Sequence, residues 1–322
     1  VKAYDAASGK GIASDLIEYG GDEDRWLCFG ANSVHTSANE KSVDSYADDL
    51  AKKLLAASDY APSAAEEDPP EEVFTVEKIE GLPEDFIFGM DASSVISLED
   101  SGVVFRGFDG EPQDVFVTLA EGGITHIRVR VWNDPYDADG NGYGGGNCDV
   151  EKACRIGKRA ADAGLKLIVD FHYSDFWADP GKQMVPLAWK DMSLDEKVDA
   201  IYAFTCESLA AIRDAGADVA MVQVGNETTG YMCGERDFNN IMRMMSSGSR
   251  AVRETAPGAL VALHFTNPER SDSYGWYASK LDSAGIDYDV FASSYYPCWH
   301  GSFDNLRTVL SNVASTYGKK VI

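Results

Sequence analysis

Short apolar runs alternate with longer segments of helical periodicity from residue 86 onward, and this alternation constrains the fold more than any other feature. The apolar runs have the length of buried strands; they are residues 86–90, 126–132, 165–171, 219–224, 260–265, 289–295 and 320–322. Between them, apolar residues recur every three or four positions, as in residues 150–163, 194–215, 238–255 and 303–317. Strands and helices that alternate in this way predict a parallel sheet with helices on its outside.

Glycines mark the boundaries of this pattern. Gly164, Gly216 and Gly285 each stand at the end of a helical segment, just before the next strand, where glycine is favoured as a helix terminator. Seven strands begin in order, and no GxGxxG motif follows the first. We therefore expect an α/β protein of the (β/α)8 TIM-barrel class rather than a doubly wound sheet. With seven strands in the sequence, we expect the barrel to be incomplete and its eighth strand absent.

The first part of the chain does not follow the alternation. Residues 42–58 carry one apolar stripe at helical spacing, and residues 61–72 are rich in Pro and Glu, which is typical of a linker. We place a short N-terminal non-barrel segment, an accessory segment of unknown type, at residues 1–60. A Pro/Glu-rich linker follows at residues 61–80, and the barrel occupies residues 81–322.

The net charge and the cysteine pattern restrict the classes of ligand and metal that the protein is expected to bind. The formal net charge is −25, which opposes binding to nucleic acid or to an anionic membrane surface and favours a neutral ligand. The six cysteines form neither a CxxC pair nor zinc-ligand spacing. We expect no structural zinc and mostly reduced thiols.

Polar and aromatic side chains gather at the predicted strand ends, which in a barrel converge on one mouth. They are Asp91, Arg128, Arg130, Trp132, Asp170, His172, Asp175, Asn226, Glu227, His264, Tyr295, Tyr296, Trp299 and His300. Aromatic faces match the C–H faces of sugars, and carboxylates and amides bond hydroxyls, so this mixture indicates a carbohydrate site. The alternative for Asn226 and Glu227 alone is that they cap the following helix.

Several of these segments resemble glycoside hydrolase family 53, the arabinogalactan endo-β-1,4-galactanases. The matching text is Phe88-Gly89-Met90-Asp91-Ala92-Ser93-Ser94, Arg128-Val129-Arg130-Val131-Trp132-Asn133-Asp134-Pro135, the block from Asp170 to Gln183, Gln223-Val224-Gly225-Asn226-Glu227, and Ser294-Tyr295-Tyr296-Pro297. The resemblance implies a retaining endo-β-1,4-galactanase that hydrolyses β-1,4-galactan or arabinogalactan side chains of plant pectin. It also implies an extracellular or cell-surface monomer that needs no cofactor.

The resemblance further assigns roles. It makes Glu227 the general acid/base and Asn226 the residue that bonds the sugar 2-hydroxyl, and it puts a nucleophilic Glu just beyond Ile322. We therefore expect residues 1–322 alone to lack turnover. Arg130 and Tyr295 would orient the nucleophile, with Arg128 and Tyr296 as alternatives that spacing does not exclude. The remaining substrate-binding candidates are Asp91, Trp132, His172, Asp175, Trp177, His264, Trp299 and His300.

Three further readings stay open. One is a barrel that binds galactan without turnover. A second is a hydrolytic metal held by Asp170, His172 and His264. The third is calcium. The segment from Asp137 to Gly142 opens like an EF-hand loop, but its twelfth position is Cys148 instead of Glu. In bacterial relatives calcium binds between strands seven and eight, which the resemblance places after the given sequence.

Overall fold

The computed structural model describes residues 2–4, 11–14, 79–270 and 272–322. The chain divides into two compact units, Val1–Pro83 and Glu84–Ile322. In the first unit, β1 (Lys2–Tyr4) pairs antiparallel with β2 (Gly11–Ser14). The predicted helix at residues 42–58 and the linker at residues 61–72 lie outside the described residues. The predicted domain limits therefore stay predictions.

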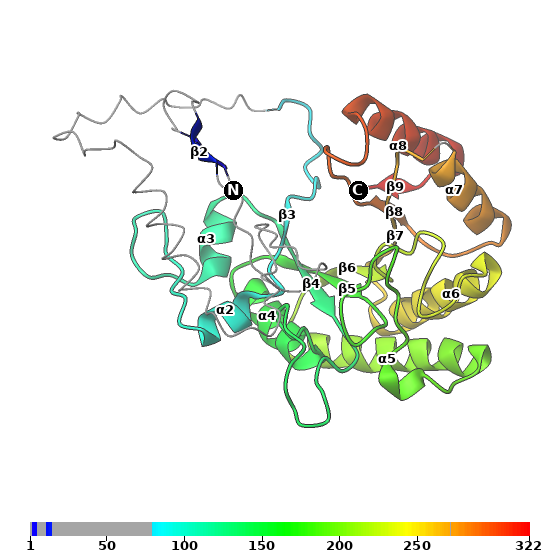
Figure 1. Cartoon of the computed structure of the whole chain (residues 1–322), viewed down its shortest axis with the longest axis horizontal. Coiled ribbons are helices and arrows are strands. Elements are labelled where there is room, and N and C mark those ends of the chain that lie inside the picture. Colours follow the sequence, from blue (N-terminus) through cyan, green and yellow to red (C-terminus); the bar gives the residue numbers. More distant parts are fainter. Residues whose placement is uncertain (1, 5–10, 15–78, 271) are drawn as a thin grey trace. The chain divides into compact units, whose positions relative to one another are not determined.

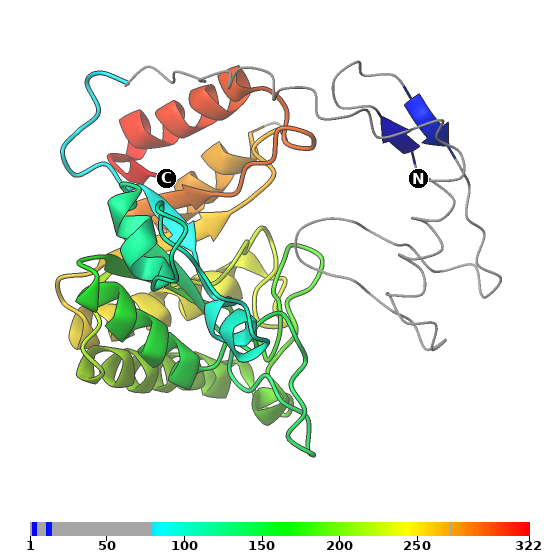
Figure 2. The same cartoon turned by 90° about the vertical axis from the view of Figure 1, so that its left-hand side faces the viewer.

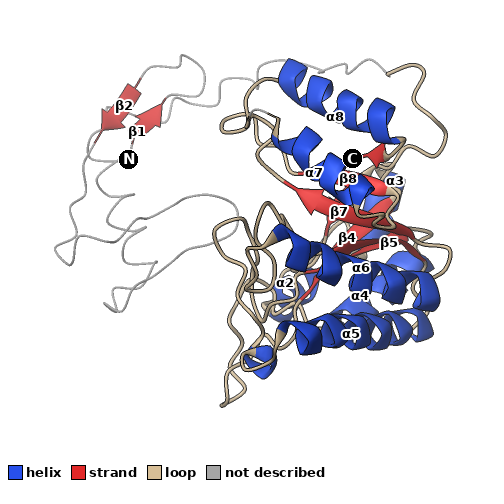
Figure 3. Cartoon of the chain, turned by 90° about the vertical axis from the view of Figure 1, so that its right-hand side faces the viewer, coloured by secondary structure: helices blue, strands red, loops and turns tan. Residues whose placement is uncertain are grey.

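The second unit is built on a parallel sheet of seven strands, which follow one another in chain order. They are β3 (Gly89–Asp91), β4 (His126–Val131), β5 (Lys166–Phe171), β6 (Val219–Val224), β7 (Leu260–Phe265), β8 (Val290–Ser293) and β9 (Lys320–Val321). Figures 1–3 show the helices packed along the outer side of these strands. The prediction of a partial barrel of alternating strands and helices is confirmed.

The described helices of this unit are α2 (Val95–Asp100), α3 (Val115–Glu121), α4 (Val150–Asp162), α5 (Leu194–Asp214), α6 (Phe238–Thr255), α7 (Ser273–Ser283) and α8 (Phe303–Tyr317). Five of them, α3, α4, α5, α6 and α8, begin at a residue whose side chain caps the first turn. Asp149, Asp237 and Ser302 accept from backbone N–H groups of the first turns of α4, α6 and α8. Ser193 and Glu196 form a capping box at the start of α5. Within the described residues, no helix is long and apolar enough to cross a membrane.

The glycines predicted to end helices have the conformation that this role requires. Gly164, Gly216 and Gly285 follow the last residues of α4, α5 and α7 with φ angles of 77°, 99° and 64°. A side chain is disfavoured in this left-handed region. The strand boundaries predicted just after them therefore lie close to the observed ones.

Two predicted strands were too long. The run at 86–90 becomes the shorter β3 because the amide of Phe88 bonds to the Thr125 hydroxyl rather than to a strand carbonyl. The run at 289–295 becomes the shorter β8. Just before it, the carboxylate of Asp289 binds Arg253 and the amide of Val261. Past β8 the chain turns, and the amide of Tyr296 bonds to Nδ1 of His300.

The strands have two distinct faces, because successive side chains point to opposite sides. Outward residues such as Val129, Val169 and Val222 pack with the helices in the main core. A smaller apolar cluster contains Ile168, Met221, Ala262, Val290 and Ala292, which alternate with those outward positions. On the same inward face, Arg128, Asp170, Gln223 and His264 occupy the neighbouring positions. This alternation carries the polar residues into the barrel mouth.

Five cysteines lie in the described part of the chain, and all are free thiols: Cys148, Cys154, Cys206, Cys233 and Cys298. The expectation of reduced thiols is confirmed for these five. Cys28 lies outside the described residues.

Candidate functional site

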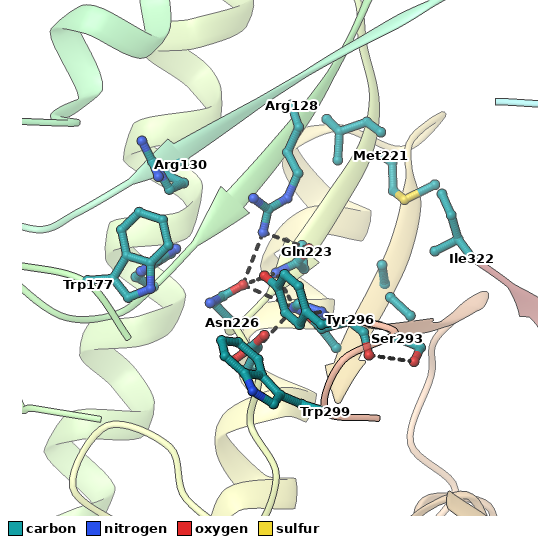
Figure 4. Close-up of a pocket in the computed structure, with 17 residues that line it drawn as sticks. Arg128, Arg130, Trp177, Met221, Gln223, Asn226, Ser293, Tyr296, Trp299 and Ile322 are labelled. Atoms are coloured by element: carbon teal, nitrogen blue, oxygen red, sulfur yellow. Dashed lines mark hydrogen bonds between the residues drawn. The ribbon is translucent and has the colours of Figure 1, made fainter. Parts of the chain in front are cut away.

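A pocket of about 430 Å³ opens at the carboxyl ends of the strands (Figure 4). Seven predicted site residues line it: Arg130, His172, Trp177, Asn226, Glu227, His264 and Trp299. Arg128 and Tyr296, the alternatives to Arg130 and Tyr295, line it as well. Apolar groups from the inward strand face, including Met221 and Ala262, complete its floor.

Five predicted site residues lie outside this lining, and each has another structural role. Tyr295 donates its hydroxyl to the carbonyl of Gly301 at 2.6 Å, and Trp132 is fully buried with its Nε1–H donated to His172. Neither residue lines the pocket. The predicted roles, orientation of the nucleophile for Tyr295 and a sugar subsite for Trp132, stay predictions.

The other three residues form hydrogen bonds or an ion pair with other groups of the protein. Asp175 accepts from the amides of Asp134 and Leu187, so it joins two loops. His300 is buried and accepts from the amide of Tyr296. Asp91 pairs with Arg128 at 2.8 Å.

Arg128 is the cation at the centre of the site. Its Nη2 lies 2.6 Å from Oδ2 of Asp170 and 3.0 Å from Oδ1 of Asn226. Figure 4 shows its guanidinium pointing toward Asn226 and Gln223. Burial lowers the pKa of Arg128, but Asp170 and Asp91 outweigh burial and raise it. Arg128 therefore fixes the Asn226 amide in one orientation and remains charged.

Arg130 points elsewhere, although it lies on the same strand face as Arg128. Its guanidinium carbon sits 4.3 Å from the centre of the Trp177 ring, which is a cation–π contact. Its Nη2 donates to the Ser94 hydroxyl and the Gly145 carbonyl. Arg130 thus positions an aromatic wall, whereas Arg128 reaches the polar centre.

His172 has a defined tautomer. Its Nδ1 accepts from Nε1–H of Trp132 at 3.1 Å and from the amide of Ala178 at 3.0 Å. The proton therefore lies on Nε2, which donates to Asp170 at 2.9 Å. The buried Asp170 carboxylate is thus held by His172, Arg128 and the amide of Gln223.

Gln223 was missed as a site residue by the sequence analysis. Its side-chain amide lies within hydrogen-bond reach of Asp170, Asn226 and His264. The sequence did contain a signal for this role, because Gln223 is the one polar residue in the strand segment Val219–Val224. A lone polar residue in a buried strand requires partners.

Glu227 stands three residues after the end of β6, in the left-handed region with φ of 48°. Its own amide donates to Nδ1 of His264, and the next amide, that of Thr228, donates to the His264 carbonyl. These bonds hold a conformation that costs energy for a residue with a side chain. A separate observation argues against the helix-cap role of Asn226 and Glu227. The next helix, α6, is capped by Asp237.

Glu227 is also the electrostatically distinctive group of the pocket. Burial raises the pKa of its carboxyl group, and the charge of Asp179 adds to this effect. A hydrogen bond from Ser294 and the charges of His300 and Arg128 oppose it. A carboxyl group whose pKa is raised at a pocket wall is suited to proton transfer near neutral pH.

Aromatic rings line the same pocket as Glu227. Trp177, Tyr296 and Trp299 line the pocket, and the Trp299 side chain is 73% exposed. Trp299 and Tyr296 lie 5.9 Å apart between ring centres in a tilted arrangement. An exposed ring that projects beside polar groups offers a flat apolar surface to a sugar ring.

The residues proposed as metal ligands are engaged by other groups of the protein. Asp170 binds Arg128 and His172, and His264 contacts Ser294 through Nε2 at 2.8 Å. The described residues contain no group of three His, Cys, Asp or Glu side chains placed to hold a metal ion. In the loop that resembles an EF hand, Asp137 instead accepts from the amides of Asp139 and Asn141.

Comparison with known proteins gives a consistent set of similarities. The sequence model of Glycosyl hydrolase family 53 matches residues 87–322. The endo-β-1,4-galactanase of Bacillus subtilis is 56% identical over 247 residues, which is 77% of this chain and 58% of that protein. The arabinogalactan endo-β-1,4-galactanase of Humicola insolens is 32% identical, over 72% of this chain and 71% of that protein.

A solved structure agrees with these similarities. The family 53 glycoside hydrolase catalytic domain of Ignisphaera aggregans matches with a TM-score of 0.73 and 35% identity. The match covers 77% of this chain and 69% of that chain. This chain therefore spans little more than half of the Bacillus relative and about two thirds of the Ignisphaera domain.

Proposed function

The chain belongs to glycosyl hydrolase family 53, and from this premise we propose that the protein is an endo-β-1,4-galactanase. Its substrate is the β-1,4-galactan or arabinogalactan of plant pectin side chains. The names of the Bacillus and Humicola relatives support this substrate class. So does a pocket that combines exposed aromatic rings, two side-chain amides and one carboxyl group.

The single observation that carries the proposal is the environment of Glu227. Its carboxyl group lines the pocket, its backbone is fixed by His264, and burial raises its pKa. A glycosidase acid must hold a proton until the leaving oxygen takes it. Among the residues that line the pocket, Glu227 supplies the carboxyl group, and its environment favours holding a proton.

The proposed reaction is a double displacement with retention. A nucleophilic carboxylate attacks the anomeric carbon while Glu227 donates its proton to the leaving oxygen. Glu227 then takes a proton from the water that hydrolyses the glycosyl-enzyme. Asn226, held by Arg128 and by the Ala178 carbonyl, is assigned the bond to the sugar 2-hydroxyl.

The nucleophile of this reaction is assigned by family resemblance to a glutamate just after Ile322. Ile322 itself lines the pocket and its carbonyl accepts from the amide of Ser293. A residue that follows it would lie at the same pocket.

The alternative is a protein that binds galactan without turnover. The observation that favours it is that Glu227 is the only carboxylate among the described residues that line the pocket. Both readings place a polysaccharide in the same groove. The proposal extends to location and assembly: a monomer that acts outside the cell, where plant polysaccharide is available.

The test is hydrolysis of linear β-1,4-galactan by the natural protein, followed as release of reducing ends. We expect Glu227→Gln to lose nearly all activity, because the amide cannot donate the proton. Glu207→Gln, an isosteric change at an exposed position of α5, should keep wild-type activity. Full activity in Glu227→Gln would refute the assignment. Galactan binding without any wild-type turnover would establish the alternative.

A further inference from the structure

His264 connects the backbone of Glu227 to the side chain of Ser294. The amide of Glu227 lies 3.2 Å from Nδ1 of His264, and the side-chain amide of Gln223 lies 3.0 Å from the same nitrogen. Both of these groups are donors, so Nδ1 is an acceptor. The proton of the neutral imidazole therefore lies on Nε2.

The opposite tautomer fits less well. A proton on Nδ1 could be donated to Oδ1 of Asn226, which lies at 3.0 Å. The backbone amide of Glu227 would then face another proton and lose this acceptor, at a partly buried position. Oδ1 of Asn226 already accepts from Arg128, so it does not require the histidine proton.

His264 is also held neutral. Burial and the neighbouring Arg128 lower the pKa of His264 to about 3. With one proton, on Nε2, the ring donates to Oγ of Ser294 at 2.8 Å. This bond occupies a lone pair of the serine oxygen, so the single hydroxyl proton of Ser294 remains for another acceptor.

We propose that Ser294 is a positioning residue that donates this proton to the Glu227 carboxylate. The hydrogen bonds then run in one direction, from the amide of Glu227 through His264 and Ser294 to the carboxylate of the same Glu227. The relay fixes the side-chain rotamer of Glu227 and favours its ionised form. The inference deepens the proposed galactanase function and rests on it.

The balance of charges at Glu227 supports this role. Among the influences that lower the pKa of Glu227, the hydrogen bond from Ser294 is the largest. The other ionisable groups that face Glu227 are Arg128 on β4, Asp179 after β5, His264 on β7, Tyr274 in α7, and Tyr296 and His300 after β8. Removing the Ser294 hydroxyl leaves all of these groups in place.

The consequence concerns the step in which Glu227 acts as an acid. Burial alone would raise the pKa of Glu227 and extend to higher pH the range over which it holds the proton that this step needs. A donor on the carboxylate offsets burial and lowers the pH at which that proton is lost. Ser294 therefore sets the alkaline limit of activity, where Glu227 loses the proton that it needs as an acid.

The experiment compares pH profiles of kcat/KM on β-1,4-galactan for the natural protein, Ser294→Ala and Ser294→Thr. In Ser294→Ala we expect the alkaline limb to move to higher pH by about half a unit or more. Ser294→Thr keeps the hydroxyl and should keep the wild-type limb. Coincident alkaline limbs for Ser294→Ala and wild type would overturn the relay.

A further variant, Ser294→Cys, tests the proposal if Ser294→Ala does not fold. Ser294→Cys keeps the size of the side chain but donates weakly, so its alkaline limb should fall between those of wild type and Ser294→Ala. Thermal unfolding confirms that each variant is folded. If Ser294→Ala does not fold, a wild-type limb in Ser294→Cys sinks the proposal.

Glu227→Gln, measured in parallel, separates the two levels of the argument. Retained galactan hydrolysis in Glu227→Gln would remove the proposed function itself. Loss of activity in Glu227→Gln together with unshifted limbs in the Ser294 variants would remove only the relay.

Discussion

Nη2 of Arg128 lies 2.6 Å from Oδ2 of Asp170, inside the barrel mouth. Burial raises the pKa of Asp170, but the charge of Arg128, together with His172 and His264, outweighs it and lowers the pKa to about 2. The pair is therefore ionised at neutral pH. The ion pair holds the Arg128 guanidinium in a position from which it also bonds Asn226.

Removing the carboxylate charge should destabilise the protein. Asp170→Asn leaves the Arg128 guanidinium with the partly exposed Asp91 as its remaining carboxylate partner, and breaking such a pair costs about 3 kcal/mol. Denaturant unfolding measures this cost. Asp199→Asn, at an exposed position of α5, is the control and should change stability by about 0.5 kcal/mol or less. Equal stabilities of the two variants would contradict the role of the pair.

The same pair predicts an acid dependence. The folded-state pKa of Asp170 lies below its ordinary value of 3.8, so its stabilisation is complete above that value and is lost as pH falls toward about 2. The stability difference between wild type and Asp170→Asn should shrink over this window. Thermal melts at pH 5, 4 and 3 measure it, and a constant difference would contradict the assignment.

Glu227 predicts the opposite pH dependence. Its folded-state pKa is raised by burial, so the folded state binds the proton more tightly and stability falls as pH rises above the ordinary value of 4.5. Glu227→Gln, which carries no charge, should raise Tm at pH 7 by about 2 °C. The gain should vanish at pH 4. A Tm that falls at pH 7 would show that the carboxylate stabilises the fold.

Trp299 predicts an effect on substrate binding. Its ring is largely exposed and lines the pocket, so Trp299→Ala should remove a stacking surface worth about 1 kcal/mol. We expect KM for galactan to rise roughly fivefold, with kcat little changed. Trp276→Ala, at a half-exposed ring on α7 outside the lining, is the matched control. A fall in kcat with unchanged KM would place Trp299 in the chemical step.

The sequence was sufficient for the architecture because the elements are regular. Strands β6 and β7 and helices α6 and α8 have the predicted limits. Each of these four elements has a strong periodic pattern, and capping residues mark the starts of the two helices. The short strand β3 was predicted poorly, and the amide of Phe88, just before it, bonds to the Thr125 hydroxyl instead of a strand carbonyl.

The site was predictable at the level of residue sets but not of individual partners. Arg128 and Arg130 stand two positions apart, which puts both on one strand face, so spacing could not separate them. The structure separates them through Trp177, which takes the Arg130 guanidinium. Tyr295 and Tyr296 lie in a loop, where no periodicity says which ring faces the pocket.

The central claim is that Glu227 donates the proton to the leaving group, and substrates that differ in leaving group test it most directly. In the natural protein, kcat/KM of Glu227→Ala is measured on β-1,4-galactan and on a dinitrophenyl β-galactobioside, whose leaving group needs no protonation. The account predicts that kcat/KM falls roughly 10²- to 10⁴-fold on galactan and little on the aryl substrate. It also predicts that added azide raises kcat on the aryl substrate. Equal losses on both substrates, or no loss on galactan, would contradict it.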